Sequence, residues 1–251
     1  MKRSIVVVKF GSELVTNEHG VDHVLIAEYA EGLIKAYKPS DLIIVTSGAV
    51  KTGLARAKQI GSTISYDEVT LAQLGAAQIV SAWEQAFAKQ GVLAGGLLVT
   101  HHELTDSNEG PKFITALRSA LQVGVVSIVN ENDALSDTEL MQLAVGGDND
   151  GLAAHIAQKV GASKLVLFTA KGGILDDDNH LIATINSSNA DSVQSMLVQR
   201  GRAKKSVGAG RGGIVTKFSA ARSAAQSGVL AIIAKPAPDM HGELITEFVV
   251  G

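Results

Sequence analysis

Two short blocks of amide and carboxylate side chains carry the strongest chemical signal in the sequence. Asn130-Glu131-Asn132-Asp133 follows a short apolar run, and Gly147-Asp148-Asn149-Asp150 opens a helical pattern that continues through Ala157. Asn and Asp favour turns and helix N-caps, so each block is expected at the end of a buried element, where α/β proteins bind ligands. Because carboxylates only accept hydrogen bonds whereas amides also donate, the two blocks together suit a small zwitterion. A pair of solvated loops with helix caps is the alternative interpretation.

Two lysines occupy positions where an ammonium group is expected to meet an anion. Lys9 directly follows the β-branched run at residues 5–8 and precedes Gly11. Burying an ammonium group there is costly unless it meets a partner or a ligand, and the alternative is a side chain that extends to solvent. Lys217 lies in the first turn of a predicted helix, where a cation opposes the helix dipole, so it is either a tolerated surface residue or a partner for an anion.

The glycine-rich segment at residues 208–213 has the spacing of a phosphate-binding loop. It matches G-x-G-x-x-G literally, but no strand precedes it and the following strand ends at Lys235 rather than at an acid, which excludes the dinucleotide-binding interpretation. The sequence contains neither the other protein-kinase motifs nor a Walker A motif. Backbone N–H groups before a helix that begins near Thr216 still favour an anion. Ser47-Gly48 offers a hydroxyl and an unhindered N–H group at the end of another predicted strand.

Other polar clusters are interpreted as surface features. His101-His102-Glu103 lacks the H-E-x-x-H spacing of a zinc site, and Asp176-Asp177-Asp178 lacks the spacing of a calcium-binding EF-hand. The basic cluster of Arg200, Arg202, Lys204 and Lys205 is expected to be a solvated face, with an approach to a bound nucleotide as the alternative. The sequence therefore predicts no metal site built from protein side chains alone.

Composition narrows the class of protein. A chain of 251 residues suffices for one large α/β domain or two small ones, and a hydrophobic fraction of 46% excludes disorder. The formal net charge of -3 gives no overall attraction for nucleic acid, and the absence of Cys excludes disulfides and thiolate chemistry. No apolar run is long enough for a signal peptide or a membrane span, so a soluble cytoplasmic protein is expected.

Buried strands and helical patterns alternate along the chain. Strands are predicted at residues 5–8, 42–46, 92–100, 125–129, 165–169, 229–234 and 244–250. Helices are predicted at residues 24–37, 49–60, 67–88, 113–121, 151–157, 193–198 and 216–227. The alternation predicts an α/β protein with a mainly parallel sheet covered on both faces. We expect one domain over residues 1–251 with two lobes, at about 1–162 and 163–251.

Taken in order, five strings resemble the amino acid kinase family over essentially the whole chain. They are Val8-Lys9-Phe10-Gly11-Ser12, Val45-Thr46-Ser47-Gly48-Ala49, Asn130-Glu131-Asn132-Asp133, Gly147-Asp148-Asn149-Asp150 and Gly212-Gly213-Ile214-Val215-Thr216-Lys217. The two blocks rich in Asn and Asp are the part specific to the glutamate-phosphorylating branch. The resemblance implies a three-layer α/β/α sandwich around a mainly parallel sheet. It also implies Mg²⁺-dependent transfer of the ATP γ-phosphoryl group to the side-chain carboxylate of L-glutamate, the first step of proline biosynthesis.

The resemblance implies roles for individual residues. The implied catalytic residues are Lys9, Lys217 and Asp150, with Asp150 organising the two lysines. The implied L-glutamate site comprises Ser47, Asp133, Asp148 and Asn149. The implied ATP site comprises Lys9, Thr169, Ala170, Arg211, Gly212, Gly213, Ile214, Val215, Thr216 and Lys217. Position 170 usually carries Asp in this family, and Ala170 cannot accept a hydrogen bond through its side chain.

The residues also predict a simple mechanism and a simple geometry. A carboxylate is already a nucleophile, so catalysis reduces to in-line positioning and neutralisation of phosphoryl charge by lysine and Mg²⁺. Lys9 and Lys217 are therefore expected in one cleft, with their ammonium groups within about 10 Å of each other and Asp150 between them.

The resemblance further implies a homo-oligomer, a dimer or a tetramer, and inhibition by proline as a feature of many members. Many members append a C-terminal PUA domain, an RNA-binding type of module, and this domain is expected to be absent because the chain stops at Gly251. No nucleic-acid or membrane partner is expected. A kinase for acetylglutamate, aspartate or UMP and a non-catalytic sensor on the same fold are the alternatives. The presence of both Lys9 and Lys217 argues against the sensor.

Overall fold

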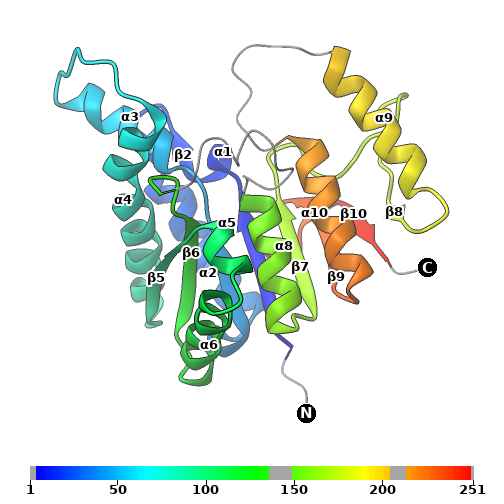
Figure 1. Ribbon diagram of the computed structural model, residues 1–251, viewed down its shortest axis with the longest axis horizontal. Coiled ribbons are helices and arrows are strands. Elements are labelled where there is room, and N and C mark those ends of the chain that lie inside the picture. Colours follow the sequence, from blue (N-terminus) through cyan, green and yellow to red (C-terminus); the bar gives the residue numbers. More distant parts are fainter. Residues whose placement is uncertain (1–3, 136–148, 204–212, 250–251) are drawn as a thin grey trace.

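The structure, a computed structural model, describes residues 4–135, 149–203 and 213–249 and is built around one large sheet (Figure 1). The strand order of this eight-stranded sheet is β5-β6-β4-β1-β7-β9-β10-β8. Its strands are β1 (Val6–Phe10), β4 (Leu42–Val45), β5 (Ala94–Val99), β6 (Val126–Glu131), β7 (Lys164–Phe168), β8 (Thr184–Ile185), β9 (Leu230–Lys235) and β10 (Glu243–Phe248). Neighbouring strands run parallel except β9 and β10, which are antiparallel. The mainly parallel sheet predicted from the sequence is therefore confirmed.

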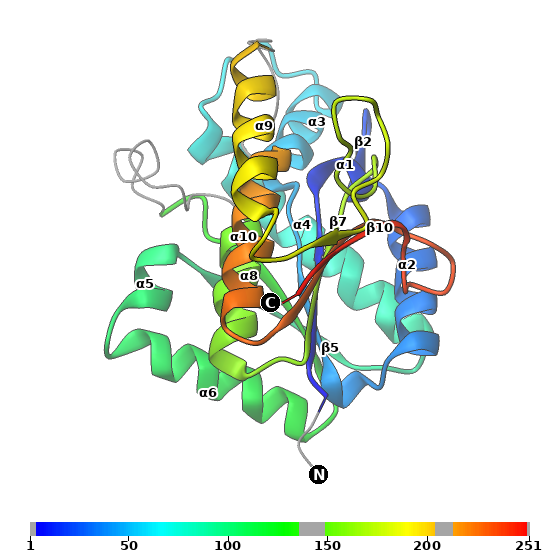
Figure 2. The same cartoon turned by 90° about the vertical axis from the view of Figure 1, so that its right-hand side faces the viewer.

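Helices cover both faces of this sheet (Figure 2). The described helices are α1 (Ser12–Val15), α2 (His23–Ala36), α3 (Ala49–Gln59), α4 (Glu68–Lys89), α5 (His101–Thr105), α6 (Glu109–Gln122), α8 (Asn149–Val160), α9 (Ala190–Ala203) and α10 (Ile214–Gln226), with a 3₁₀ turn at Pro39–Asp41. In Figure 2, α5, α6, α8 and α10 lie on one side of the sheet, and α2 and α4 lie on the other. The expected three-layer α/β/α sandwich is confirmed.

The apolar strands explain why the sheet needs two covering layers. Side chains alternate between the two faces of a strand, and in β1 the side chain of Val7 enters the core under α8 and α10. Val6, Val8 and Phe10 enter the second core, under α2 and α4. Because every residue of β1 is buried, exposing either face to water would leave apolar side chains uncovered.

Close helix packing fixes the segment that follows β4. An added Cβ on Gly75 of α4 would lie 2.0 Å from the carbonyl oxygen of Ala49, and an added Cβ on Gly53 of α3 would lie 1.9 Å from the carbonyl oxygen of Leu71. Only glycine allows the backbones of α3 and α4 to approach this closely. Gly48, which precedes α3, has φ of +109°, a conformation that side chains with a Cβ rarely adopt.

Parallel pairing brings several strand ends to one edge of the sheet. Lys9 is opposite Val45 of β4 and Leu167 of β7, and Val45 is opposite Val129 of β6. The C-terminal ends of β1, β4, β6 and β7 therefore lie side by side, which is where ligands bind in open α/β sheets. A short hairpin of β2 (Thr16–Asn17) and β3 (Gly20–Val21) follows β1 and α1.

The structure corrects the boundary of one predicted strand. Asn130 and Glu131 belong to β6 and are buried, although the sequence analysis ended this strand at Val129. Their backbone groups are paired because the register with β5 continues to Leu98 and Val99. Tertiary pairing thus outweighs the weak strand propensity of Asn.

Other differences concern short or extended elements. Helix α9 covers Ala190–Ala203 rather than residues 193–198, and α1, the β2–β3 hairpin, α5 and β8 have no counterpart among the predicted elements. The division into two lobes near residue 162 stays a prediction. Strand β1, from the first predicted lobe, pairs with β7, from the second, within the same sheet. In the part of the chain that the structure describes, every helix is too short or too polar to cross a bilayer.

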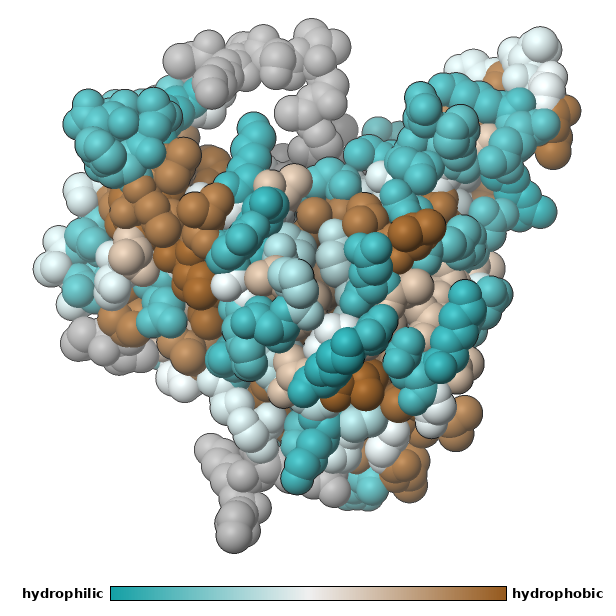
Figure 3. All heavy atoms as spheres, turned by 180° about the vertical axis from the view of Figure 1, so that it is seen from behind, coloured by the Kyte–Doolittle hydropathy of each residue, from teal (hydrophilic) through white to brown (hydrophobic). Residues whose placement is uncertain are grey.

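Apolar side chains are exposed on the back of the molecule, on the side of β10 (Figure 3). Leu244 of β10 is 51% exposed. Leu175, which is 37% exposed, pairs with Leu181 in an antiparallel bridge, and residues 175–181 form a short hairpin. The hairpin turn itself is polar: Asp176, Asp178 and His180 place their ligand atoms within 4.8 Å of one another there. Arg200, expected on a solvated face, instead donates to Asp177 and to the Leu175 carbonyl oxygen, which ties α9 to the hairpin.

Candidate active site

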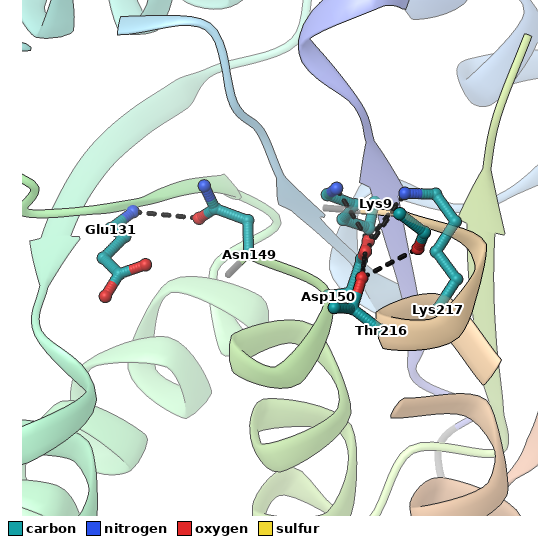
Figure 4. Close-up of polar contacts among 7 residues, drawn as sticks. Lys9, Glu131, Asn149, Asp150, Thr216 and Lys217 are labelled. Atoms are coloured by element: carbon teal, nitrogen blue, oxygen red, sulfur yellow. Dashed lines mark hydrogen bonds and ion pairs between the residues drawn. The ribbon is translucent and has the colours of Figure 1, made fainter. Parts of the chain in front are cut away.

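A buried carboxylate joins two lysines at the C-terminal edge of the sheet (Figure 4). Asp150, in the first turn of α8, is fully buried, and its Oδ1 lies 2.7 Å from the Lys9 Nζ at the end of β1. The Nζ of Lys217, in the first turn of α10, lies 3.0 Å from the Asp150 Oδ2 and 3.3 Å from the Oδ1. The structure therefore brings the three side chains together as the sequence led us to expect, whereas their catalytic roles remain predictions.

The charges of this group favour an anionic ligand. Burial by itself raises the pKa of Asp150, but the nearby charges of Lys9 and Lys217 and the hydrogen bonds from both outweigh burial and hold that pKa below its ordinary value. Asp150 is therefore ionised at neutral pH. Two ammonium groups and one carboxylate sum to a formal charge of +1, which suits the charge of a phosphoryl group undergoing transfer.

Thr216 adds a third contact to the same carboxylate. Its Oγ1 donates to the Asp150 Oδ2 at 3.1 Å and lies 2.8 Å from the carbonyl oxygen of Gly213, the N-cap residue of α10. The first turn of α10 thus supplies two side chains, Thr216 and Lys217, to one carboxylate on the first turn of α8. The N-termini of α8 and α10 therefore meet at Asp150. Because helix N-termini favour anions, both helices favour an anionic ligand at this place.

A second contact joins the two blocks rich in Asn and Asp. The Asn149 Oδ1 accepts a hydrogen bond from the backbone N–H of Glu131 at 3.1 Å. In Figure 4 the side chain of Asn149 points toward Glu131, on the side away from the lysines. The end of β6 and the start of α8 are therefore held together, and Asn149 and Asp150 face different parts of the site.

Asn130 is a candidate functional residue to which the sequence analysis gave no role. Its side chain is fully buried in β6, and neither its Nδ2 nor its Oδ1 has a hydrogen-bond partner within the described residues. An unsatisfied buried amide costs about 1–3 kcal/mol, so such a group is expected to meet a ligand or water. The signal was present in the sequence as an Asn directly after the largely apolar run Val125-Val126-Ser127-Ile128-Val129, but the burial of Asn130 was not predicted.

A cavity of about 560 Å³ opens beside the end of β6. Small or apolar residues of α3, α4 and β5 form most of its wall, namely Ala49, Ala72, Ala76, Ala77, Val80, Gly96 and Leu98. Gln73 and Glu84 of α4 add polar side chains to this wall, and Glu131, Asn132 and Asp133 line the end beside β6. Burial raises the pKa of Asp133 to about 6, because the charged carboxylate loses its hydration there. The cavity therefore combines a mostly apolar wall with a carboxylate that titrates near neutral pH.

Ser47 lies at the end of β4, the strand next to β6 in the sheet. It is partly buried between Thr46 and Gly48, and its carbonyl oxygen accepts from the Thr46 Oγ1 at 3.3 Å. Ser47 follows β4, and Asn149, at the start of α8, is hydrogen-bonded to Glu131 at the end of the neighbouring strand β6, so both residues lie at the same sheet edge. Their assignment to a glutamate site remains a prediction.

Apart from Lys9 of β1, the residues predicted to bind ATP come from the end of β7 and the start of α10. Thr169 is largely buried, its N–H donates to the Ala234 carbonyl oxygen, and its Oγ1 accepts from the Lys171 N–H at 3.3 Å. Ala170 is exposed beside it. The other predicted members within the described chain are Gly213, Ile214, Val215, Thr216 and Lys217, around the first turn of α10. Three predicted site residues lie outside the described residues: Asp148, Arg211 and Gly212.

Several solved structures share the fold of the molecule. It superposes on carbamate kinase from Giardia with a TM-score of 0.65 at 14% identity, covering 99% of both chains. It superposes on isopentenyl phosphate kinase with a TM-score of 0.64 at 17% identity, covering 98% of this chain and 100% of the other. At these identities the likeness defines the fold class alone. The sequence profile of the amino acid kinase family matches residues 4–235, and the chain belongs to that family.

Curated relatives within the family share a name. Glutamate 5-kinase from Pseudomonas aeruginosa strain PAO1 is 36% identical over 229 residues, which cover 88% of this chain and 59% of the relative. Glutamate 5-kinase from Pseudomonas syringae pv. syringae is 35% identical over 234 residues, which cover 90% of this chain and 61% of the relative. The chain thus spans about three fifths of the length of these relatives, in their kinase part.

Proposed function

We propose that the chain carries out the glutamate 5-kinase reaction, in which ATP phosphorylates the side-chain carboxylate of L-glutamate to give L-glutamyl 5-phosphate. This reaction would be the first step of proline biosynthesis. The observation that carries the proposal is the fully buried Asp150 between Lys9 and Lys217, at the sheet edge where Asn149 also contacts Glu131. The names of the relatives supply the acceptor.

The proposed chemistry needs little from the protein beyond position and charge. An oxygen of the glutamate side-chain carboxylate forms a bond to the γ-phosphorus of ATP, and the bond from that phosphorus to the β,γ-bridging oxygen breaks. The acceptor is already ionised, so no proton has to move and no general base is required. Lys9 and Lys217 would neutralise charge on the transferred group and the leaving group, and Asp150 would hold both ammonium groups in place before ATP binds.

The start of α10 fits a triphosphate. The N-terminus of a helix of 13 residues and the Nζ of Lys217 lie together there, and both favour anions. Mg²⁺ commonly binds through substrate phosphates with few protein ligands, and when bound it would supply further neutralisation of phosphate charge. Since Asp150 is engaged by two lysines and Thr216, we assign Mg²⁺ mainly to the ATP phosphates.

The glutamate site is proposed at the ends of β4 and β6. The Asp133 carboxylate would meet the α-ammonium group, while the Ser47 hydroxyl and the Asn149 amide would meet the carboxylates of the ligand. Asn130 is added to this set, because its unsatisfied amide is buried two residues before the cavity wall at Asn132. Asp148 belongs to the same proposal by its place in the sequence.

The test is ADP release measured with a panel of acceptors. We expect Mg²⁺-dependent turnover with L-glutamate, and trapping of the acyl phosphate by hydroxylamine should yield the corresponding hydroxamate. The panel includes N-acetylglutamate, aspartate and UMP, and a preference for any of these assigns a different kinase. The matched control is Lys217→Met, which should bind L-glutamate but release no ADP. Binding of L-glutamate without ADP release by the wild-type protein would identify a sensor and refute the proposal.

We extend the proposal to the setting of the enzyme. A two-lobe domain, a cytoplasmic homo-oligomer, either a dimer or a tetramer, and inhibition by proline are proposed from the family resemblance. Light scattering measures the oligomeric state, and ADP release with added proline measures inhibition. A net charge of -3 supports the absence of appreciable RNA affinity at physiological salt. Steeply salt-dependent binding to RNA at submicromolar protein would contradict that expectation.

A further inference from the structure

A buried tryptophan is hydrogen-bonded to Thr46, the residue that precedes Ser47. The indole Nε1 of Trp83, on α4, donates to the Thr46 Oγ1 at 3.1 Å, and both residues are fully buried. The Thr46 Oγ1 in turn lies 3.3 Å from the Ser47 carbonyl oxygen. An indole N–H can only donate, so the Thr46 oxygen must accept, and its single proton is left for the Ser47 carbonyl. The direction of both hydrogen bonds is therefore fixed by Trp83.

The same face of α4 supports the rest of this segment, residues 46–49, which we call the substrate loop. Trp83 meets its first residue, and Ile79, four residues earlier on α4, lies 3.3 Å from the place where a Cβ on Gly48 would stand. Gly75, a further four residues earlier, leaves room for the carbonyl oxygen of Ala49. Residues four apart lie on one face of a helix, so one stripe of α4 determines the course of the loop.

Trp83 also connects this loop with the strand that carries Lys9. Its ring lies 5.0 Å from the ring of Phe10, which directly follows Lys9 in β1. The Phe10 ring lies 5.3 Å from that of Phe168, which precedes Thr169. Trp83, Phe10 and Phe168 thus form one aromatic cluster that contacts the ends of β1, β4 and β7. The indole N–H of Trp83 links this cluster to Thr46 by a hydrogen bond.

We propose that Trp83 is a positioning residue for the substrate loop, acting through the Thr46 hydroxyl to orient Ser47 for the amino-acid substrate. The inference rests on the proposed function, since it takes L-glutamate as the ligand of the loop. Trp83 itself is buried and acts only through Thr46 and the packing of α4. Its loss would leave a buried hydroxyl without its donor and the Ser47 carbonyl without a fixed partner.

The experiment compares three substitutions in the full chain. Thr46→Val removes the hydroxyl, Thr46→Ser keeps it, and Trp83→Phe removes only the N–H of the ring. We expect Thr46→Val to raise KM for L-glutamate roughly tenfold while KM for ATP changes by less than about twofold. Trp83→Phe should change KM in the same direction, and Thr46→Ser should restore values close to those of the wild type. The double variant should be no worse than Thr46→Val, because both changes break one chain of hydrogen bonds.

The matched control is Phe87→Leu. Phe87 is fully buried one turn further along α4 and stacks on Trp83 with ring centroids 6.0 Å apart, but it carries no polar group. This variant should lower the unfolding temperature without changing the ratio of the two KM values. Equal changes of both KM values in Thr46→Val, or failure of Thr46→Ser to restore the wild-type values, would overturn the role of Trp83.

Trp83 is the single tryptophan of the chain, so its emission provides an independent readout. Titration of the wild-type protein with L-glutamate should change the emission, and the response should weaken in Thr46→Val. An emission unaffected by L-glutamate overturns the proposal. Wild-type protein that releases no ADP with L-glutamate refutes the proposed function and this role with it. Full wild-type activity combined with unchanged kinetics in Thr46→Val refutes the role of Trp83 alone.

Discussion

Replacing Asp150 by Asn would remove a negative charge that two buried lysines share. The carboxylate lies 2.7 Å from the Lys9 Nζ and 3.0 Å from the Lys217 Nζ. At an effective dielectric constant of about 20, opposite charges about 4 Å apart attract by about 4 kcal/mol, before the cost of desolvation is counted. Asn has nearly the same shape, so the variant keeps the packing but leaves two ammonium groups facing a neutral amide. Breaking a buried ion pair in this way costs about 3–5 kcal/mol.

The assay is thermal unfolding followed by circular dichroism. For a chain of this length, each kcal/mol lowers Tm by about 2–4 °C, so Asp150→Asn should lower Tm by about 6–20 °C at neutral pH. Asp191→Asn is the matched control, because the Asp191 carboxylate is 85% exposed and pairs with Arg222 at the surface. A surface pair contributes at most about 1 kcal/mol, so the control should lose no more than about 4 °C.

The pH dependence of the stability distinguishes the loss of the Asp150 charge from a loss of packing. In the wild type the pKa of Asp150 lies below its ordinary value of 3.8, so its stabilising contribution is present above that value and is lost as pH falls through the lowered pKa. In the variant, the buried lysines lack a counter-ion and their pKa values are expected to fall. The folded variant then binds fewer protons than the unfolded chain, and its stability should rise with pH toward about 10. A variant with the Tm and pH profile of Asp191→Asn would refute the reasoning.

Three further predictions concern the proposed substrate site and helix packing. Asn149→Ala should raise KM for L-glutamate far more than KM for ATP, because it removes a polar partner worth about 1–3 kcal/mol, and equal rises would show that the site is misplaced. Because burial raises the pKa of Asp133 to about 6, its carboxylate becomes protonated as pH falls through that value, and kcat/KM for L-glutamate should fall with it in steady-state assays. Asp133→Asn should abolish this fall in kcat/KM at acidic pH. If the fall persists in the variant, another group causes it. Gly75→Ala should lower Tm, because the added Cβ would lie 2.0 Å from the Ala49 carbonyl oxygen. Gly201→Ala in α9 meets nothing within 4 Å and should stabilise the protein by about 0.5–1 kcal/mol; stabilisation by Gly75→Ala would show that α3 and α4 can separate freely.

The architecture could be predicted from the sequence because the strand segments are almost entirely apolar and therefore easy to recognise. Leu42-Ile43-Ile44-Val45 is apolar throughout, which is typical of a strand covered on both faces, and such strands alternate with helical patterns. The juxtaposition of Lys9, Asp150 and Lys217 was also expected before the geometry was known. Each lies at an element end, and parallel topology gathers those ends at one edge.

The remaining features depend on contacts between distant segments. The burial of Asn130 follows from the pairing of β6 with β5, which no local pattern reveals. The support of the substrate loop by Trp83 joins residues 37 apart and depends on the crossing of α3 and α4 at glycines. The raised pKa of Asp133 results from loss of hydration, which depends on the cavity wall rather than on neighbouring residues in the sequence. Sequence periodicity reports which side of an element is buried, but not what it is buried against.

The central place of β1 has a consequence for how the chain acquires its site during synthesis. This strand is synthesised before both of its neighbours in the sheet, β4 and β7, and β7 begins only at Lys164. Lys9 therefore cannot be enclosed until the chain has been synthesised as far as β7, and Lys217 is synthesised later still. Contacts over such sequence distances are slow to form, because the loop between them must close first. The nascent protein should accordingly acquire its site in one late step, with no partially active intermediate beforehand.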